Sequence, residues 1–368
     1  MASANSNPGP DTIVLQSAEY VPATALTITG PTTITGSPTF QGSGARINGT
    51  TAEGATPGDL FIIGDATHSP LVTFKALQIF GGSELGSGVI HLTNGTLSLQ
   101  NDSISNNPGT AVLTDFGTTT NSVNTDLSDQ TGNAVTNNGT ITLLNNTVTQ
   151  NGSGGINNLG DLHLINTVVA QNDPSSIGFS DCSGSTATAP TVASLDSDNT
   201  CGVSLHASNP GLRVQNQWGG PTPGHVPLST SPLVNVAAAN ANCPGVDQRF
   251  FLRPVGANCD IGSMERGTSD SQGTQDTTAP TCVVTRTAYP SGQPAQQDVT
   301  VSDSGSGVFD GISDITFTAG QGTAAFTTPQ FPGSVVVTAT KNNAGQAVND
   351  TSWQFTATDS VGNSKLCK

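Results

Sequence analysis

The sequence predicts an all-β chain, in which a parallel β-helix is followed by a small β-sandwich. One string returns three times, as NGTLSLQNDSISNN at Asn94–Asn107, NGTITLLNNTVTQN at Asn138–Asn151 and LGDLHLINTVVAQN at Leu159–Asn172. Aligning the glycines of these strings gives a period of about 22 residues, which is typical of solenoids. Each repeat also holds short alternating runs of β-forming residues that are split by Gly and Asn.

Such short strands cannot form a stable sheet alone, but stacked at one turn per repeat they form long parallel sheets. In a right-handed parallel β-helix the aliphatic side chains point inward and Thr and Ser point outward. The expected core comprises Leu97, Leu99, Ile104, Ile141, Leu143, Val148, Leu162, Leu164 and Val168. Asparagine tolerates the left-handed backbone that corners need. We therefore interpret the recurring asparagines as structural corners rather than as a ligand-binding ladder.

The residues after the repeats carry a series of short motifs. In order along the chain these are Asn209–Leu212, Gly219–His225, Ser231–Leu233, Asp247–Arg249, Arg253–Pro254 and Cys259–Glu265. This series resembles the C-terminal part of bacterial choice-of-anchor Q proteins. The resemblance covers most of the chain up to Glu265, and it implies a secreted or surface β-helix, often with pectate-lyase-like repeats. The family commonly has Gly after Asp-Gln-Arg, where this chain has Phe250. The family name describes anchoring, not a reaction.

The last part of this region is rich in charged residues. Arginine forms forked pairs with carboxylates, so we expect a structural cap that closes the open end of the coil. The cap residues are Asp247, Arg249, Arg253, Asp260 and Glu265. The first predicted domain therefore spans residues 1–265.

The remainder of the chain divides into a linker and a second domain. Residues 266–279, RGTSDSQGTQDTTA, are polar and have the composition of a linker. Residues 280–368 contain alternating β-forming runs at the spacing of a β-sandwich. Their DSGSGV and ATDSVGN strings resemble bacterial immunoglobulin-like surface repeats, which implies an immunoglobulin-like fold.

Composition excludes several classes of function. The chain has 10 Lys and Arg against 26 Asp and Glu, and its net charge of -16 opposes binding to nucleic acid or to anionic membranes. No apolar stretch reaches the roughly 18 residues that a membrane helix needs. The start, MASANSNPGP, lacks the basic and apolar regions of a signal peptide.

Six cysteines, none in a C-x-x-C pair, favour disulfides and an extracytoplasmic location over zinc or redox chemistry. Many pairings are open, and we favour the sequence-local set, with free buried thiols as the alternative. That set joins Cys182 to Cys201, Cys243 to Cys259 and Cys282 to Cys367.

Candidate catalytic groups are few. The carboxylate pairs are Asp196 with Asp198 and Asp126 with Asp129, and the cations of the repeat region are Lys75 and Arg46. Cleavage of a polysaccharide needs such groups on one face. Both carboxylate pairs lie in Ser- and Thr-rich loop sequence, and the two cations are far apart and on different turns. The five histidines are scattered, at His68, His91, His163, His206 and His225. We therefore assign no catalytic residue and no cofactor. The loop Asp303–Asp310 is a candidate calcium site, although a plain turn is the simpler interpretation.

Three functions remain open. The first is a secreted or surface structural protein of a bacterium that adheres to carbohydrate or protein. Such a protein could assemble into fibres by end-to-end stacking, because the start at Thr24–Thr35 shows no capping helix. The second is a polysaccharide lyase or hydrolase. The third is a glycan- or ice-binding surface made of Thr rows, suggested by TALTITGPTTITG. Fold alone does not separate the first two.

Overall fold

The computed structural model describes residues 1–6, 9–36, 44–50, 58–82, 88–173, 178, 180–188, 192–240, 242–251, 253–267, 279–288, 296–302, 308–317, 322–326, 334–341, 353–359 and 364–367. The chain forms two compact units, Met1–Arg266 and Gly267–Lys368, so the boundary falls at the start of the predicted linker. Each unit is described by itself.

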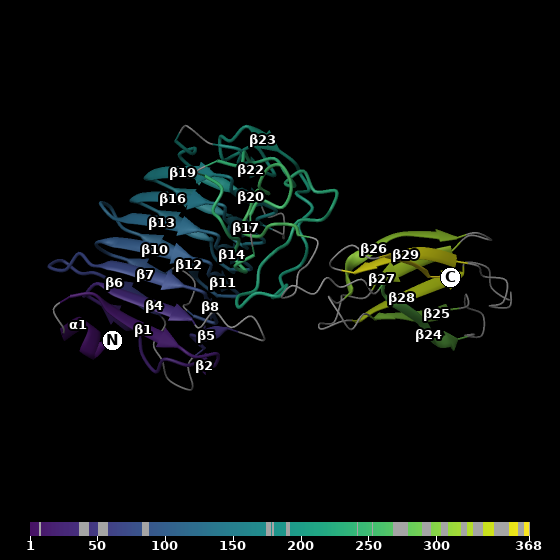
Figure 1. The fold of residues 1–368 in the computed structure, drawn as a ribbon, viewed down its shortest axis with the longest axis horizontal. Coiled ribbons are helices and arrows are strands. Elements are labelled where there is room, and N and C mark those ends of the chain that lie inside the picture. Colours follow the sequence, from purple (N-terminus) through teal and green to yellow (C-terminus); the bar gives the residue numbers. More distant parts are fainter. Residues whose placement is uncertain are drawn as a thin grey trace. The chain divides into compact units, whose positions relative to one another are not determined.

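The first unit is a parallel β-helix in which, up to β21, every third strand joins the same sheet (Figure 1). The first sheet contains β1 (Asp11–Leu15), β4 (Thr32–Gly36), β7 (Leu71–Lys75), β10 (Thr96–Gln100), β13 (Thr119–Val123), β16 (Thr140–Leu144) and β19 (Asp161–Ile165). The second sheet contains β2 (Glu19–Tyr20), β5 (Ala45–Asn48), β8 (Leu77–Phe80), β11 (Ser103–Ser105), β14 (Asp126–Ser128), β17 (Thr147–Thr149), β20 (Val168–Ala170), β22 (Leu195–Asp196) and β23 (Leu205–His206). The third sheet contains β3 (Leu26–Ile28), β6 (Phe61–Ile63), β9 (Gly88–Leu92), β12 (Thr110–Thr114), β15 (Val135–Asn137), β18 (Ile156–Asn158) and β21 (Cys182–Gly184).

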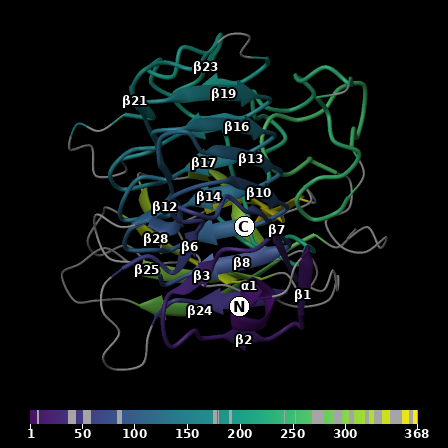
Figure 2. The ribbon, with the colours of Figure 1, turned by 90° about the vertical axis from the view of Figure 1, so that its left-hand side faces the viewer.

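The register of the strands confirms the repeat that the sequence predicts. In the first sheet Thr96 pairs with Thr119, Thr119 with Thr140, and Thr140 with Asp161. These offsets are 23, 21 and 21 residues. The prediction of a parallel β-helix is therefore confirmed, and one turn of the coil corresponds to one sequence repeat (Figure 2).

The hydrophobic core lies inside the coil and contains all but one of the predicted core residues. The exception is Val168, which is buried on the opposite side of its strand, while its neighbour Val169 faces the core. Along most strands buried and exposed residues alternate, and this pattern shows which residues face the core. In β20 all three positions are buried, because the outer face is covered as well, and so the pattern did not reveal which residue points inward.

The recurring asparagines form the corners, as the sequence predicts. Between the first and second sheets, Asn101, Asn124, Asn145 and Asn166 stack in the left-handed conformation, with φ between 49° and 60°. A second set lies inside the corner between the second and third sheets. There Asn151 Nδ2 donates to Asn172 Oδ1 over 2.8 Å, and Asn151 Oδ1 accepts from the backbone N–H of Gln130 over 3.2 Å. The polar groups of successive turns are thus satisfied by one another.

A long segment, residues 209–266, covers the outer face of the second sheet. We call it the strap, and both views show it alongside the stacked turns (Figures 1 and 2). The corner asparagines point at it: the side-chain amides of Asn101, Asn124 and Asn166 donate to strap carbonyls over 2.6, 2.8 and 2.7 Å. A second hydrophobic cluster, which includes Val168, Ala170, Leu195, Leu233, Ala237, Cys259 and Ile261, joins strap and sheet.

The charged residues predicted as an end cap lie in the strap instead. The pairing itself is present, because Arg249 contacts Asp247 over 2.7 Å and Arg253 contacts Glu265 over 3.0 Å, all of them buried. Their location differs from the prediction. The carbonyl of Asp247 accepts from Asn101 and that of Asp260 from Asn145, which lie at corners along the flank of the coil. The strap runs back along the flank, because its polar motifs pair with the corner asparagines.

Other segments cover the ends of the coil. At the N-terminal end the short helix α1 (Ala2–Ser6) places Asn5 against β3, where it bonds to the carbonyl of Thr27 and to the N–H of Thr29. Met1 packs on the core. This end is therefore covered by a short helix before Thr24–Thr35, which the sequence did not predict. At the other end the segment around the Cys182–Cys201 disulfide contributes both cysteines and Val203 to the core cluster.

The second unit contains two antiparallel sheets. One has the order β24 (Thr281–Ala288), β25 (Gln296–Ser302), β28 (Ser334–Lys341) and β27 (Gly322–Phe326). The other has the order β26 (Val308–Phe317), β29 (Trp353–Asp359) and β30 (Ser364–Cys367). A disulfide joins Cys282 to Cys367. Together with Cys182–Cys201 and Cys243–Cys259, it makes up the set that sequence separation favours. Within the described ranges no helix is long and apolar enough to cross a membrane.

Candidate functional site

The first pair of candidate carboxylates holds the segment at the C-terminal end of the coil. The buried Asp196 accepts a hydrogen bond from the backbone N–H of Cys201 over 2.8 Å and contacts Nδ1 of His206. Asp198 accepts from the N–H of Asp181 over 2.9 Å and from the hydroxyl of Thr200 over 2.6 Å. Both side chains therefore organise the region of the disulfide.

The second pair lies beneath the strap. Asp126 Oδ2 is 2.7 Å from Nδ1 of His225, and its Oδ1 accepts from the hydroxyl of Ser128 over 2.6 Å. Burial would lower the pKa of His225, but the charge of Asp126 and the hydrogen bond to it outweigh burial and raise that pKa. Burial also raises the pKa of the neighbouring Asp129. This buried group attaches the strap to the second sheet.

The two cations of the repeat region do not meet. Lys75 ends β7 in the first sheet, whereas Arg46 belongs to β5 in the second sheet. Arg46 is 3.2 Å from Glu19 Oε2, and its guanidinium lies 4.8 Å from the ring centre of Phe80. Arg46 is thus already engaged within the second sheet, while Lys75 belongs to the first.

His91 on β9 is the centre of a cluster that sequence reasoning missed. Its Nδ1 lies 2.7 Å from Oδ2 of Asp59, and its Nε2 lies 3.3 Å from Oδ1 of Asp115. The other oxygen of Asp59 accepts from the backbone N–H of Gly88 over 2.9 Å. The hydrogen bond to Asp59 raises the pKa of His91; burial opposes this shift, and the charge of Asp59 and the contact with Asp115 add to it. A histidine held between two carboxylates therefore lies on the third sheet.

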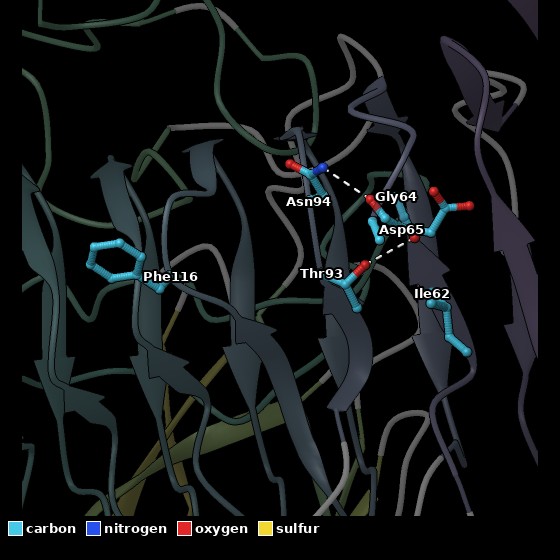
Figure 3. A pocket seen from close by; sticks show the side chains of 7 residues that line it. Ile62, Gly64, Asp65, Thr93, Asn94 and Phe116 are labelled. Carbon is cyan, nitrogen blue, oxygen red and sulfur yellow. Dashed lines mark hydrogen bonds between the residues drawn. The ribbon is translucent and has the colours of Figure 1, made fainter.

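An open hollow of about 550 Å³ adjoins this cluster (Figure 3). Three successive corners after β6, β9 and β12 form it, with the lining residues Ile62, Gly64, Asp65, Ala66, Thr93, Asn94 and Phe116. Ile62 is paired with His91 in the sheet, and Asp115 directly precedes Phe116. The cluster and the hollow therefore share one surface.

Hydrogen bonds between turns hold the wall of the hollow. The hydroxyl of Thr93 donates to the carbonyls of Ile63 and Gly64 over 3.0 and 2.9 Å. The side-chain amide of Asn94 donates to the carbonyl of Asp65 over 3.0 Å, and its oxygen points away from this bond, toward the side of Phe116 (Figure 3). The wall is thus fixed by the coil itself.

Phe116 and Asp65 give the hollow its two chemical characters. The side chain of Phe116 is 94% exposed, although aromatic side chains gain strongly from burial. Asp65 accepts from the N–H and the hydroxyl of Thr67 and contacts His68, and these bonds hold its pKa well below the usual range. The hollow therefore combines an apolar ring with a permanent carboxylate. The Asp-Phe-Gly corner at residues 115–117, where other repeats have Asn-Gly, was the available sequence signal.

The outward-facing residues of successive strands in the first sheet form a row that mixes Thr with other residue types. Outward positions align Thr33 with Thr73, Thr73 with Ser98 and Ser98 with Asn121. His163 continues this row on β19. A regular Thr surface is therefore interrupted within the described strands.

The proposed calcium loop Asp303–Asp310 lies largely outside the described residues, which omit 303–307. Across the residues that the structure describes, no group of three or more His, Cys, Asp or Glu side chains is arranged to hold a metal ion.

The chain matches no family model, no curated protein and no solved structure in the three comparisons made.

Proposed function

We propose that this protein is a secreted or cell-surface structural protein that adheres to carbohydrate, and that it does not catalyse a reaction. The single observation that carries the proposal is Phe116, an almost fully exposed ring at the rim of a polar hollow. Sugars present apolar C–H faces and a periphery of hydroxyls. A flat ring beside fixed polar groups matches both features.

The scaffold around the hollow suits binding without rearrangement. Thr93 and Asn94 are held by bonds to the neighbouring turn, so a ligand does not have to order them. Pre-organised groups reduce the entropy lost on binding. Many copies on one surface would strengthen a weak contact through multivalency.

Three disulfides support the proposed extracytoplasmic location. The motif series of the strap supports kinship with the choice-of-anchor Q proteins. On this proposal the second unit is an immunoglobulin-like spacer or adhesive module, and its paired antiparallel sheets support that assignment.

A polysaccharide-cleaving enzyme is the second candidate, and the Asp59–His91–Asp115 cluster is the observation that favours it. A histidine whose pKa is raised keeps its proton to higher pH and can act as a general acid. Both of its ring nitrogens already contact carboxylates, however, which engages the protons that such an acid would transfer.

The test measures binding and turnover on the same samples. Wild type, Phe116→Ala and Leu159→Ala are applied to a carbohydrate array, with assays for new reducing ends and unsaturated products. Leu159 is the matched control, because it is 68% exposed at the equivalent corner after β18. We expect binding that only Phe116→Ala removes, and no product. Turnover that His91→Gln abolishes would establish the enzyme instead.

A further inference from the structure

The groups around the hollow offer hydrogen-bond acceptors to a ligand. The Thr93 hydroxyl and the Asn94 amide already donate to carbonyls of the wall. The oxygen of Asn94 faces the side of Phe116, whereas the Asp65 carboxylate points away from Phe116 and already accepts from Thr67. A carboxylate accepts hydrogen bonds and donates none. A ligand of this surface must therefore supply donors.

Charge favours the same kind of ligand. Asp65, Asp59 and Asp115 lie in or beside the hollow, and His91 contacts two of them. Both ring nitrogens of His91 contact the protein's own carboxylates, so His91 has no ring nitrogen left for an anionic ligand. Neither Lys nor Arg is among the residues that line the hollow. The local field is thus negative, in the same direction as the net charge of the chain, -16.

We infer that the hollow selects neutral, hydroxyl-rich glycans and rejects glycans built from uronic acids. This inference rests on the proposed function, because it concerns the ligand of the same site. The hydroxyls of a neutral sugar donate to Asn94 Oδ1 while one sugar face packs on Phe116, and the Asp65 carboxylate, which Thr67 and His68 already engage, adds negative charge. A uronate brings a carboxylate, which meets acceptors of its own kind and like charge. Rejection of like charge is a direct source of specificity.

The probes are chosen to differ in charge. Oligomers of galacturonic acid are compared with the same oligomers after complete methyl esterification, and neutral hexose oligomers complete the set. Affinity is measured by calorimetry at low and at high ionic strength. We expect the neutral oligomers to bind about tenfold or more tightly than the free acids at low salt, and the difference to shrink at high salt because screening weakens repulsion.

Matched variants locate the effect. Asp65→Asn and Asp115→Asn each remove one charge and keep an acceptor oxygen, so each should improve binding of the free acids severalfold. Asp161→Asn is the control, because Asp161 is an exposed carboxylate on the first sheet, and it should change nothing. Free acids that bind as well as the esters, with binding still lost in Phe116→Ala, would overturn the inference and leave the proposed function standing. Loss of neither class in Phe116→Ala would overturn both.

Discussion

His225 Nδ1 lies 2.7 Å from Oδ2 of Asp126, and both side chains are completely buried. Asp126 belongs to β14 of the second sheet, and His225 belongs to the strap. The two residues are 99 positions apart in the sequence. Their contact is therefore a tertiary attachment, and the stability of the strap should depend on it.

Replacing Asp126 by Asn should destabilise the first unit by about 3–5 kcal/mol near pH 6, because it leaves a buried imidazolium without its counter-charge. The pKa of His225 is raised in the folded state. Its stabilising contribution is thus complete below the unfolded pKa and is lost as pH rises through the folded pKa. Asp126→Asn should remove this decline.

The measurement is urea unfolding at several pH values, followed by the fluorescence of Trp218, a buried residue of the strap. The exposed Asp161→Asn serves as the control variant. An Asp126→Asn protein with wild-type stability at pH 6 would show that the pair does not hold the strap.

Replacing Asp102 by Asn should stabilise the protein at alkaline pH. Burial raises the pKa of Asp102 to about 8, against hydrogen bonds from the N–H groups of Leu77 and Gln100. The folded state therefore binds a proton that the unfolded state has released, so stability falls as pH rises from about 4 to about 8. An Asn side chain has no proton to release in this range, so the variant should not lose this stability. Asn146 already occupies the equivalent corner position two turns later.

Thermal unfolding of wild type and Asp102→Asn from about pH 4 to about pH 9 checks the prediction. The variant should gain on the order of one to several kcal/mol at pH 9 relative to pH 4. Parallel pH profiles for the two proteins would contradict it.

Replacing Asn151 by Ala should cost about 2–4 kcal/mol. Its buried amide donates to the carbonyls of Leu127 and Thr149 and to Asn172 Oδ1, and removing it leaves buried acceptors unpaired. Asn157→Ala is the matched control, because Asn157 is half-buried on the outer face of β18. Guanidinium unfolding of both variants should separate them clearly. Equal losses of unfolding free energy in the two variants would mean that the hydrogen bonds of Asn151 inside the corner do not stabilise the coil.

The full chain should remain monomeric. The helix α1 covers the first turn, and the segment of the Cys182–Cys201 disulfide covers the last one, so end-to-end stacking of cores is obstructed. Light scattering over a wide concentration range should give one constant mass. Deleting residues 1–6 is the informative variant, since association that appears only after deletion would assign the obstruction to α1.

The repeat determined much of the coil. A period of about 22 residues is a local regularity, repeated enough to define the stacking, the inward aliphatic positions and the asparagine corners. The same regularity did not reveal that Val168 faces outward and Val169 inward. The outer face of β20 is buried as well, so burial was no longer a guide to orientation.

The strap and the hollow were decided by tertiary structure alone. The strap follows the flank because single polar contacts, such as Asn101 with the carbonyl of Asp247 and Asp126 with His225, join residues 146 and 99 positions apart. Such contacts occur once and carry no period, and nothing local in the sequence pairs them. The hollow likewise depends on three consecutive corners of unequal length meeting on one face, which places Phe116, Asn94 and Asp65 around one hollow. Periodicity determined the coil, and contacts without a period determined what lies on its surface.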